Sequence, residues 1–154
     1  MATTVTVSGV IRRPVHEVFA FITDARNAPQ WQTKSGLQRI QQIPEGPVGV
    51  GTRIIEVWKF MGREAEGTSE VTEYEPNTKY TRIAVGKGGP IKQGTTTFES
   101  VPEGTRVTFD IIVSAGGLFA IAEPLLAANM KKSFETNLAE AKALLDGQAA
   151  MSAS

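Results

Sequence analysis

The stretch that decides the fold is MKKSFETNLAEAKALLD, residues 130–146, near the end of the chain. Its apolar residues recur at intervals of three and four, so they share one face of a helix and leave the charged residues on the other. The apolar face comprises Met130, Phe134, Leu138, Ala141 and Leu145. We expect a helix over about 118–146, the longest element of the chain, whose apolar stripe must be covered by another layer.

The two ends of this helix carry their own signals. Pro124 lies inside the helical pattern, where a proline removes a backbone hydrogen bond, so we expect a kink or a break near Ala122 or Glu123. The last residues, Gln148 to Ser154, are small or polar, and we expect a frayed tail there.

The layer that covers the helix is predicted upstream, in runs of alternating apolar and polar residues typical of half-buried strands. Turn-forming residues such as Pro44-Glu45-Gly46-Pro47 separate the runs and favour hairpins. The runs are 3–12, 37–43, 51–60, 64–74, 78–85, 92–101 and 105–114. Between the first two runs, Pro14 begins a helix that ends near Asp24, and a second short helical turn includes Trp31.

Six strands joined by short turns form an antiparallel meander, and the first strand brings the sheet to seven. The fold class is therefore α+β: a seven-stranded antiparallel sheet wrapped around a long C-terminal helix, with two short helices after strand one. The chain has 154 residues, about the usual size of one domain. We expect a single domain over 1–147 and the tail over 148–154.

Composition excludes several functional classes. A net charge of zero argues against a sequence-independent nucleic-acid binder, which needs an excess of Lys and Arg. The chain has no Cys, which excludes disulfides and thiolate sites and agrees with a reducing compartment, so we expect a cytoplasmic protein. No stretch approaches 18 apolar residues, and we expect no membrane span.

Several short stretches share the order and spacing of one known architecture. They are Arg13-Pro14-Val15-His16-Glu17-Val18-Phe19, Trp31 seven positions after Asp24, Val50-Gly51-Thr52-Arg53, Glu70-Val71-Thr72-Glu73-Tyr74-Glu75-Pro76, Gly104-Thr105-Arg106-Val107-Thr108 and Asn137-Leu138-Ala139-Glu140-Ala141-Lys142-Ala143-Leu144-Leu145. Together they resemble the START-like, polyketide cyclase/dehydrase superfamily (SRPBCC) over nearly the whole chain. That resemblance implies a helix-grip fold around a deep cavity. It leaves the function open, because the superfamily ranges over lipid carriage, hormone binding, cyclisation, dehydration and chaperone regulation.

The inner face of each strand is predicted from its more apolar alternate set, because that face meets the helix. On run 51–60 this set includes Glu56 beside Trp58. On run 64–74 the inward residues are Ala65, Gly67 and Ser69, which are too small to fill a core. The sequence therefore predicts a cavity or ligand site, for which a few hundred Å³ is the usual size.

The direction of Arg82 stays open in the sequence. A family-like register turns Tyr80 and Arg82 inward, whereas Ile83 favours the opposite register almost equally. If both Glu56 and Arg82 face the interior, they pair with each other or hold a polar group of a ligand, because an isolated buried charge is costly. A structural ion pair, or a solvated Glu56 at the cavity mouth, is the alternative.

Candidate ligand-binding residues line the space between the sheet and the helix, although Trp31 and Trp58 also suit plain core packing. They are Trp31, Glu56, Trp58, Ser69, Tyr80, Arg82, Phe98, Phe109 and Met130. The only histidine, His16, falls off the apolar stripe of the first helix, and no second His or Cys accompanies it. We therefore expect no metal site, no Ser-His-Asp site and no cofactor.

Three functions remain. The first is a carrier or sensor of a small, mostly hydrophobic molecule, lipid-like or polyketide-like. The second is a cyclase or dehydratase in which Glu56 is the general base and Tyr80 or Arg82 holds a developing enolate. The third is an interaction protein without a ligand. For all three we expect a monomer or a homodimer.

Overall fold

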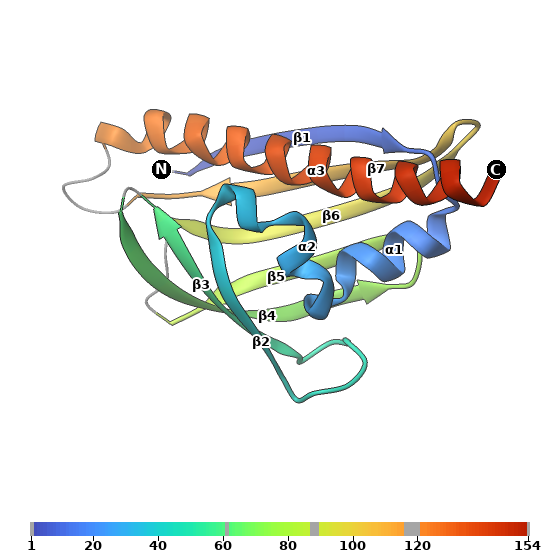
Figure 1. The fold of residues 1–154 in the computed structure, drawn as a ribbon. Coiled ribbons are helices and arrows are strands. Elements are labelled where there is room, and N and C mark those ends of the chain that lie inside the picture. The colour runs from blue at the N-terminus through green and yellow to red at the C-terminus, as the bar shows by residue number, and fades with distance from the viewer. Residues whose placement is uncertain (1, 61, 87–89, 116–120, 154) are drawn as a thin grey trace.

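The computed structural model describes residues 2–60, 62–86, 90–115 and 121–153, and Figure 1 shows its elements. The strands are β1 (Thr3–Ile11), β2 (Leu37–Ile43), β3 (Arg53–Phe60), β4 (Arg63–Glu75), β5 (Lys79–Val85), β6 (Ile91–Val101) and β7 (Gly104–Val113). They form one antiparallel sheet in the order β1-β7-β6-β5-β4-β3-β2. The predicted meander is confirmed, and β1 lies beside β7.

Short helices connect β1 to β2, as predicted. They are α1 (Val15–Thr23), the 3-10 turn η1 (Ala25–Asn27), α2 (Ala28–Trp31) and the 3-10 turn η2 (Thr33–Ser35). Gly36 ends η2 with a φ of 116°, and a Cβ there would lie 2.4 Å from the Lys59 carbonyl oxygen. Only glycine fits that position without moving β3.

The long helix α3 (Glu123–Ala153) begins where the sequence predicted a break. Pro124 lies in its first turn, where a missing N–H costs nothing because that donor has no partner within the helix. The buried Glu123 carboxylate accepts hydrogen bonds from the Ala115 N–H at 3.0 Å and the Thr3 hydroxyl at 3.3 Å. Residues 118–120 of the expected helix lie outside the described residues.

The end of α3 extends further than the predicted domain boundary. The helix continues to Ala153, through most of the stretch 148–154 for which we expected a frayed tail. The boundary at 147 stays a prediction.

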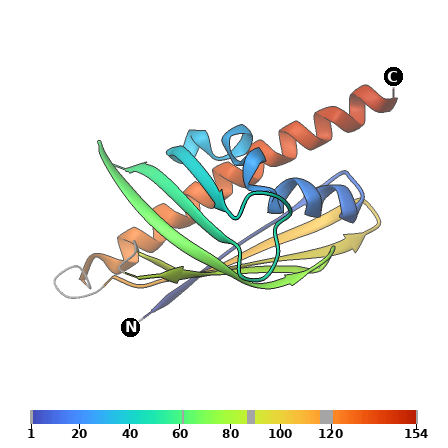
Figure 2. The ribbon, with the colours of Figure 1, turned by 90° about the horizontal axis from the view of Figure 1, so that it is seen from below.

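The core lies between one face of the sheet and the helices α1, α2 and α3. Figures 1 and 2 show α3 running along β1 and β7, on the side towards which the sheet curves. Leu138, Ala141 and Leu145 are buried there, as the predicted stripe requires, whereas Met130 and Phe134 are half-buried. The inward residues of β7 are all buried, namely Val107, Phe109, Ile111 and Val113. They are the more apolar alternate set of the strand, as the rule used for the inner faces requires.

The second half of α3 is also fastened by polar contacts. The Lys142 ammonium donates to the Val10 carbonyl at 2.9 Å and to the Asp146 carboxylate at 2.7 Å. Asp146 also accepts from the Arg12 N–H at 2.8 Å. No helix in the described parts of the chain is long and apolar enough to cross a membrane.

Candidate functional site

Glu56 lies on the inner face of β3. It alternates with Ile54, which is almost fully buried, and its own side chain is 14% exposed. In the antiparallel register Glu56 pairs with Gly67 of β4, and Ile54 pairs with Ser69. Glu56, Gly67 and Ser69 therefore share one face, as the sequence predicted.

Arg82 faces the same interior, which settles the register that the sequence left open. It pairs with the fully buried Val71 across β4 and β5. Its guanidinium donates from Nη2 to the Glu56 carboxylate and from Nε to the Ser69 hydroxyl at 2.8 Å. The opposite register fails, because Ile83 is 40% exposed on the outer face.

Charge and burial act together in this polar cluster of Glu56, Ser69, Tyr80 and Arg82. Burial alone would lower the pKa of Arg82, but the adjacent Glu56 carboxylate raises it above its ordinary value, so the guanidinium stays charged. Burial raises the pKa of the Tyr80 phenol; the Arg82 charge opposes that shift and the Glu56 charge reinforces it. Tyr80 therefore remains a neutral proton donor beside an ion pair.

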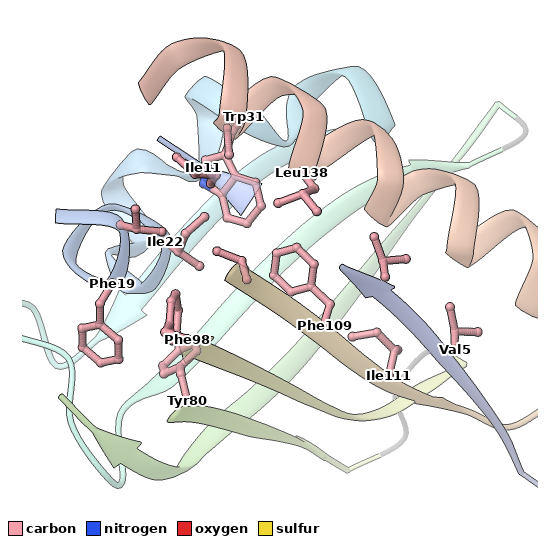
Figure 3. Close-up of a cluster of buried hydrophobic side chains, with 14 of the residues drawn as sticks. Val5, Ile11, Phe19, Ile22, Trp31, Tyr80, Phe98, Phe109, Ile111 and Leu138 are labelled. Atoms are coloured by element: carbon pink, nitrogen blue, oxygen red, sulfur yellow. The ribbon is translucent and has the colours of Figure 1, made fainter. Parts of the chain in front are cut away.

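The predicted aromatic residues are brought together in the core. Trp31 stacks on Phe109 with ring centroids 6.2 Å apart, and Phe98 contacts Phe19 edge-on at 5.0 Å. Tyr80 lies towards the sheet end of this cluster and Trp31 towards the helix end (Figure 3). Met130, half-buried, packs against the same cluster. All five of these aromatic rings are buried.

The inner face of β3 and β4 becomes more open along these strands. A Cβ added to Gly67 would meet no atom within 4 Å. Ala65 is exposed and Trp58 is half-buried, although both face the same side as Glu56. The polar cluster thus lies between a packed core and an uncovered stretch of sheet.

The surface of the molecule has two shallow pockets away from the polar cluster. One, of about 330 Å³, lies between the β1–α1 connection and the β6–β7 turn, from Arg12 to Pro14 and from Ser100 to Gly104. The other, of about 260 Å³, lies between η2 and α3 and is lined by Lys34, Ser35, Asn129, Lys132, Ser133 and Thr136. Neither contains a predicted site residue. The internal cavity therefore stays a prediction.

The sequence also made a prediction for the histidine of the first helix. His16 is exposed on α1, as its place off the apolar stripe predicted. Within the described ranges, no three His, Cys, Asp or Glu side chains come together to hold a metal ion.

The sequence did not predict that two polar side-chain atoms are buried without a hydrogen-bond partner. Among the described side chains, the buried Trp31 Nε1 and the buried Asn137 Oδ1 have no hydrogen-bond partner. Asn137 is only 2% exposed, although its neighbours on α3 include charged residues. The only feature of the sequence that could have indicated its burial is its position next to Leu138, a residue of the apolar stripe.

Comparison with known proteins agrees with this architecture. The model of the family "Polyketide cyclase / dehydrase and lipid transport" matches residues 2–146. A search of curated proteins found no match.

Among solved structures, TTHA0849 from Thermus thermophilus is 19% identical, with a TM-score of 0.75 over 91% of this chain and 94% of that one. The di-domain ARO/CYC StfQ from the steffimycin biosynthetic pathway is 13% identical, with a TM-score of 0.81 over 97% of this chain and 52% of that one. The Aha1 dimer from Colwellia psychrerythraea is 16% identical, with a TM-score of 0.68 over 94% of this chain and 96% of that one. At these identities the likeness shows the fold.

Proposed function

We propose a ligand-binding function for this chain, which belongs to the polyketide cyclase / dehydrase and lipid transport family. The chain binds a small, mostly hydrophobic ligand between the inner face of the sheet and α3, as a carrier or a sensor. The observation that carries the proposal is the polar cluster on a face that is only partly covered. The Arg82 and Glu56 side chains are 24% and 14% exposed there, beside the open space at Gly67.

The cluster suits a ligand that is apolar apart from one polar group. Removing an apolar body from water is favourable by roughly 25 cal/mol per Å², and the half-buried Trp58 offers aromatic surface for it. A guanidinium has five N–H donors in total. The described bonds of Arg82 use one donor on Nε and one on Nη2. Further donors are therefore available to a carbonyl, hydroxyl or carboxylate of the ligand.

A cyclase or dehydratase is the second candidate, and one observation favours it. Tyr80 is a neutral proton donor next to Glu56 and Arg82, which is the combination that an enolate-forming reaction requires. Against it, Glu56 would have to leave its partner guanidinium to reach a substrate. We therefore place binding first. A homodimer, as in the Aha1 protein from Colwellia psychrerythraea, is compatible with either function.

The test blocks the uncovered stretch of sheet and measures binding of the neutral fluorescent probe N-phenyl-1-naphthylamine. Gly67→Phe adds a large side chain on the inner face and removes no hydrogen bond. We expect it to weaken probe binding by about tenfold or more. The thermal midpoint should change by less than about 3 °C, because added volume destabilises a filled core but not an open space.

Thr68→Phe is the matched control, because Thr68 is the next residue of β4 and faces the opposite side. It should bind the probe as the parent does. If the parent binds no probe, or if Gly67→Phe binds it unchanged, the proposed site is wrong.

Glu56→Gln separates the two candidate functions. A carrier should keep its affinity for the apolar probe within about threefold, since the probe has no charged group. An enzyme that uses Glu56 as a base should lose turnover of a cyclisable polyketide by about a hundredfold or more. Mass spectrometry of small molecules extracted from the purified protein would identify the ligand, and an empty extract would favour an interaction protein.

A further inference from the structure

The outer face of the sheet, on the side opposite the polar cluster, has no described element packed on it. Figure 2 shows α1, α2 and α3 together on the other side of the sheet. The exposed face of an antiparallel sheet usually carries polar residues at alternate positions. Here Ile43 of β2 and Ile83 of β5 are 44% and 40% exposed. They are two of the few large apolar side chains that the described part of the chain leaves exposed.

Further apolar side chains lie between these two isoleucines. Ile55 and Val57 of β3 and Val85 of β5 alternate with inward residues, so they face outward, where they are half-buried. Thr68 of β4 pairs with both Ile55 and Val85 and lies between them. A contiguous apolar patch on a surface marks an interaction site, whereas scattered apolar residues do not. We call this set the outer patch: Ile43, Ile55, Val57, Ile83 and Val85.

Two neighbouring strands carry charges of opposite sign beside the outer patch. The outward charged residues of β3 are Arg53 and Lys59, which are both basic. In register, Arg53 pairs with Glu70 of β4 and Lys59 pairs with Glu64 of β4. A line along the sheet between β3 and β4 therefore has basic charges on one side and acidic charges on the other, at matching heights.

We propose that the outer patch is an interface between two copies of this chain, related by a twofold axis that runs along the strands between β3 and β4. A twofold interface uses the same surface on both subunits. This axis lays β3 of one protomer over β4 of the other, and β2 over β5. The two sheets then pack face to face as in a β-sandwich, and each copy covers the exposed apolar residues of the other.

The positions of the residues in the sheet make this surface complementary to itself. One row across β2, β3, β4 and β5 consists of Ile43, Arg53, Glu70 and Ile83. Rotation about the axis brings Ile43 opposite Ile83 of the partner subunit. It also brings Lys59 opposite Glu64 of the partner subunit, at the other end of β3. Apolar residues meet apolar residues and unlike charges meet, which favours a second copy over a partner of uniform charge.

The charges of the interface differ in what they contribute. Arg53 and Glu70 already pair with each other within the chain at 3.3 Å and stay partly exposed, so their share is small. Glu64 reaches Arg39 within the chain only at 3.9 Å, which leaves it able to bind Lys59 of the partner subunit. The outer patch faces away from the polar cluster, so the interface requires no ligand and does not rest on the proposed function.

The first experiment measures the mass of the protein in solution by sedimentation velocity, from about 1 µM to about 1 mM. We expect the parent to reach twice the mass of one chain within this range. Ile83→Asp places a charge against an apolar surface and should weaken the dimer by about tenfold or more. Leu125→Asp is the matched control, because Leu125 is 68% exposed on α3, away from the outer patch. It should dimerise as the parent does.

The second experiment tests the twofold axis by exchanging charges. Lys59→Glu and Glu64→Lys each place two pairs of like charges across the homodimer interface, so each variant alone should dimerise about tenfold more weakly than the parent or not at all. In an equimolar mixture of the two variants, both pairs again join unlike charges. The dimer should therefore return, with an affinity within about threefold of the parent's. Pairing within one chain cannot produce this recovery.

Lys131→Glu and Glu135→Lys control for the change in net charge. Both residues are exposed on α3, and each variant alone should dimerise as the parent does. Thermal midpoints show that the variants fold. The interface is wrong if the parent stays monomeric to about 1 mM, or if Ile83→Asp dimerises as the parent does. A mixture of Lys59→Glu and Glu64→Lys that stays monomeric would exclude this axis, and the proposed interface with it.

Discussion

Two glycines, both on the inner face of the same sheet, have opposite surroundings. A Cβ at Gly9 of β1 would lie 2.9 Å from the Leu138 Cδ2 atom of α3. A Cβ at Gly67 of β4 would meet nothing within 4 Å. We call β1 and β7 under α3 the covered half of the sheet, and the inner stretch of β3 and β4 around Trp58, Ala65 and Gly67 the open half. One helix covers one half, and the polar cluster borders the other.

This difference follows from the strand order. The chain places β1 next to β7, so the strands nearest α3 come from the two ends of the sheet in sequence. Strands β2, β3 and β4 lie at the far edge of the sheet (Figure 2). An α-helix with its side chains is only about 10–12 Å across, whereas strands lie about 4.8 Å apart. A single helix therefore covers only two or three of the seven strands.

The largest expected effect is at the centre of the covered half. Leu138→Ala should lower the free energy of unfolding by about 2–5 kcal/mol, because Leu138 is buried and its removal leaves a cavity against β1. Urea unfolding followed by circular dichroism measures it. A loss below about 1 kcal/mol would mean that α3 does not pack tightly on this half.

The next effect compares the two glycines directly. Gly9→Ala should destabilise by about 1–3 kcal/mol, because the new methyl group overlaps a packed leucine. Gly67→Ala should be neutral or stabilising by up to about 1 kcal/mol, since alanine also restricts the unfolded chain. Urea unfolding of both variants provides the test. Equal losses at both positions would contradict the division into covered and open halves.

The sequence predicted the covered half better than the open half. Alternation along β7 identified its inward residues correctly, because every second side chain is apolar and buried. The break predicted near Ala122 or Glu123 also agrees with the structure, because α3 begins at Glu123 and Pro124 lies in its first turn. The local sequence pattern is sufficient to predict the inward residues where every inward side chain of a strand is buried.

The site depends instead on contacts between distant residues. Arg82 was ambiguous because apolar Ile83 lies next to it in the sequence. Its direction is decided by Glu56 and Ser69, on two other strands. The unpartnered atoms of Trp31 and Asn137 are even harder to predict from the sequence. Whether a buried atom lacks a hydrogen-bond partner depends on all the groups that surround it in the fold. Neither residue type is unusual where it stands in the sequence.

The smallest expected effect concerns Asp146, whose polar contacts hold the end of α3 to the covered half. Its carboxylate accepts from the Arg12 N–H and from Lys142, while its side chain is 24% exposed. Burial alone would raise the pKa of Asp146, but the hydrogen bonds from Lys142 and the Arg12 backbone hold it below its ordinary value of 3.8. The folded state therefore favours the ionised form. Its contribution to stability is complete above pH 3.8 and is lost as the pH falls through the lower, folded value.

Asp146→Asn should accordingly cost about 1 kcal/mol at pH 7, a value discounted for solvent screening. The difference from the parent should disappear as the pH falls well below 3.8, where the parent carboxyl is itself protonated. Urea unfolding between pH 7 and pH 2.5 measures both variants. Glu70→Gln, which removes a mostly exposed pair with Arg53 next to the open half, is the control and should change stability by less than about 0.5 kcal/mol throughout. A difference at Asp146 that is constant with pH would assign its effect to packing and would mean that the carboxylate charge does not stabilise the covered half.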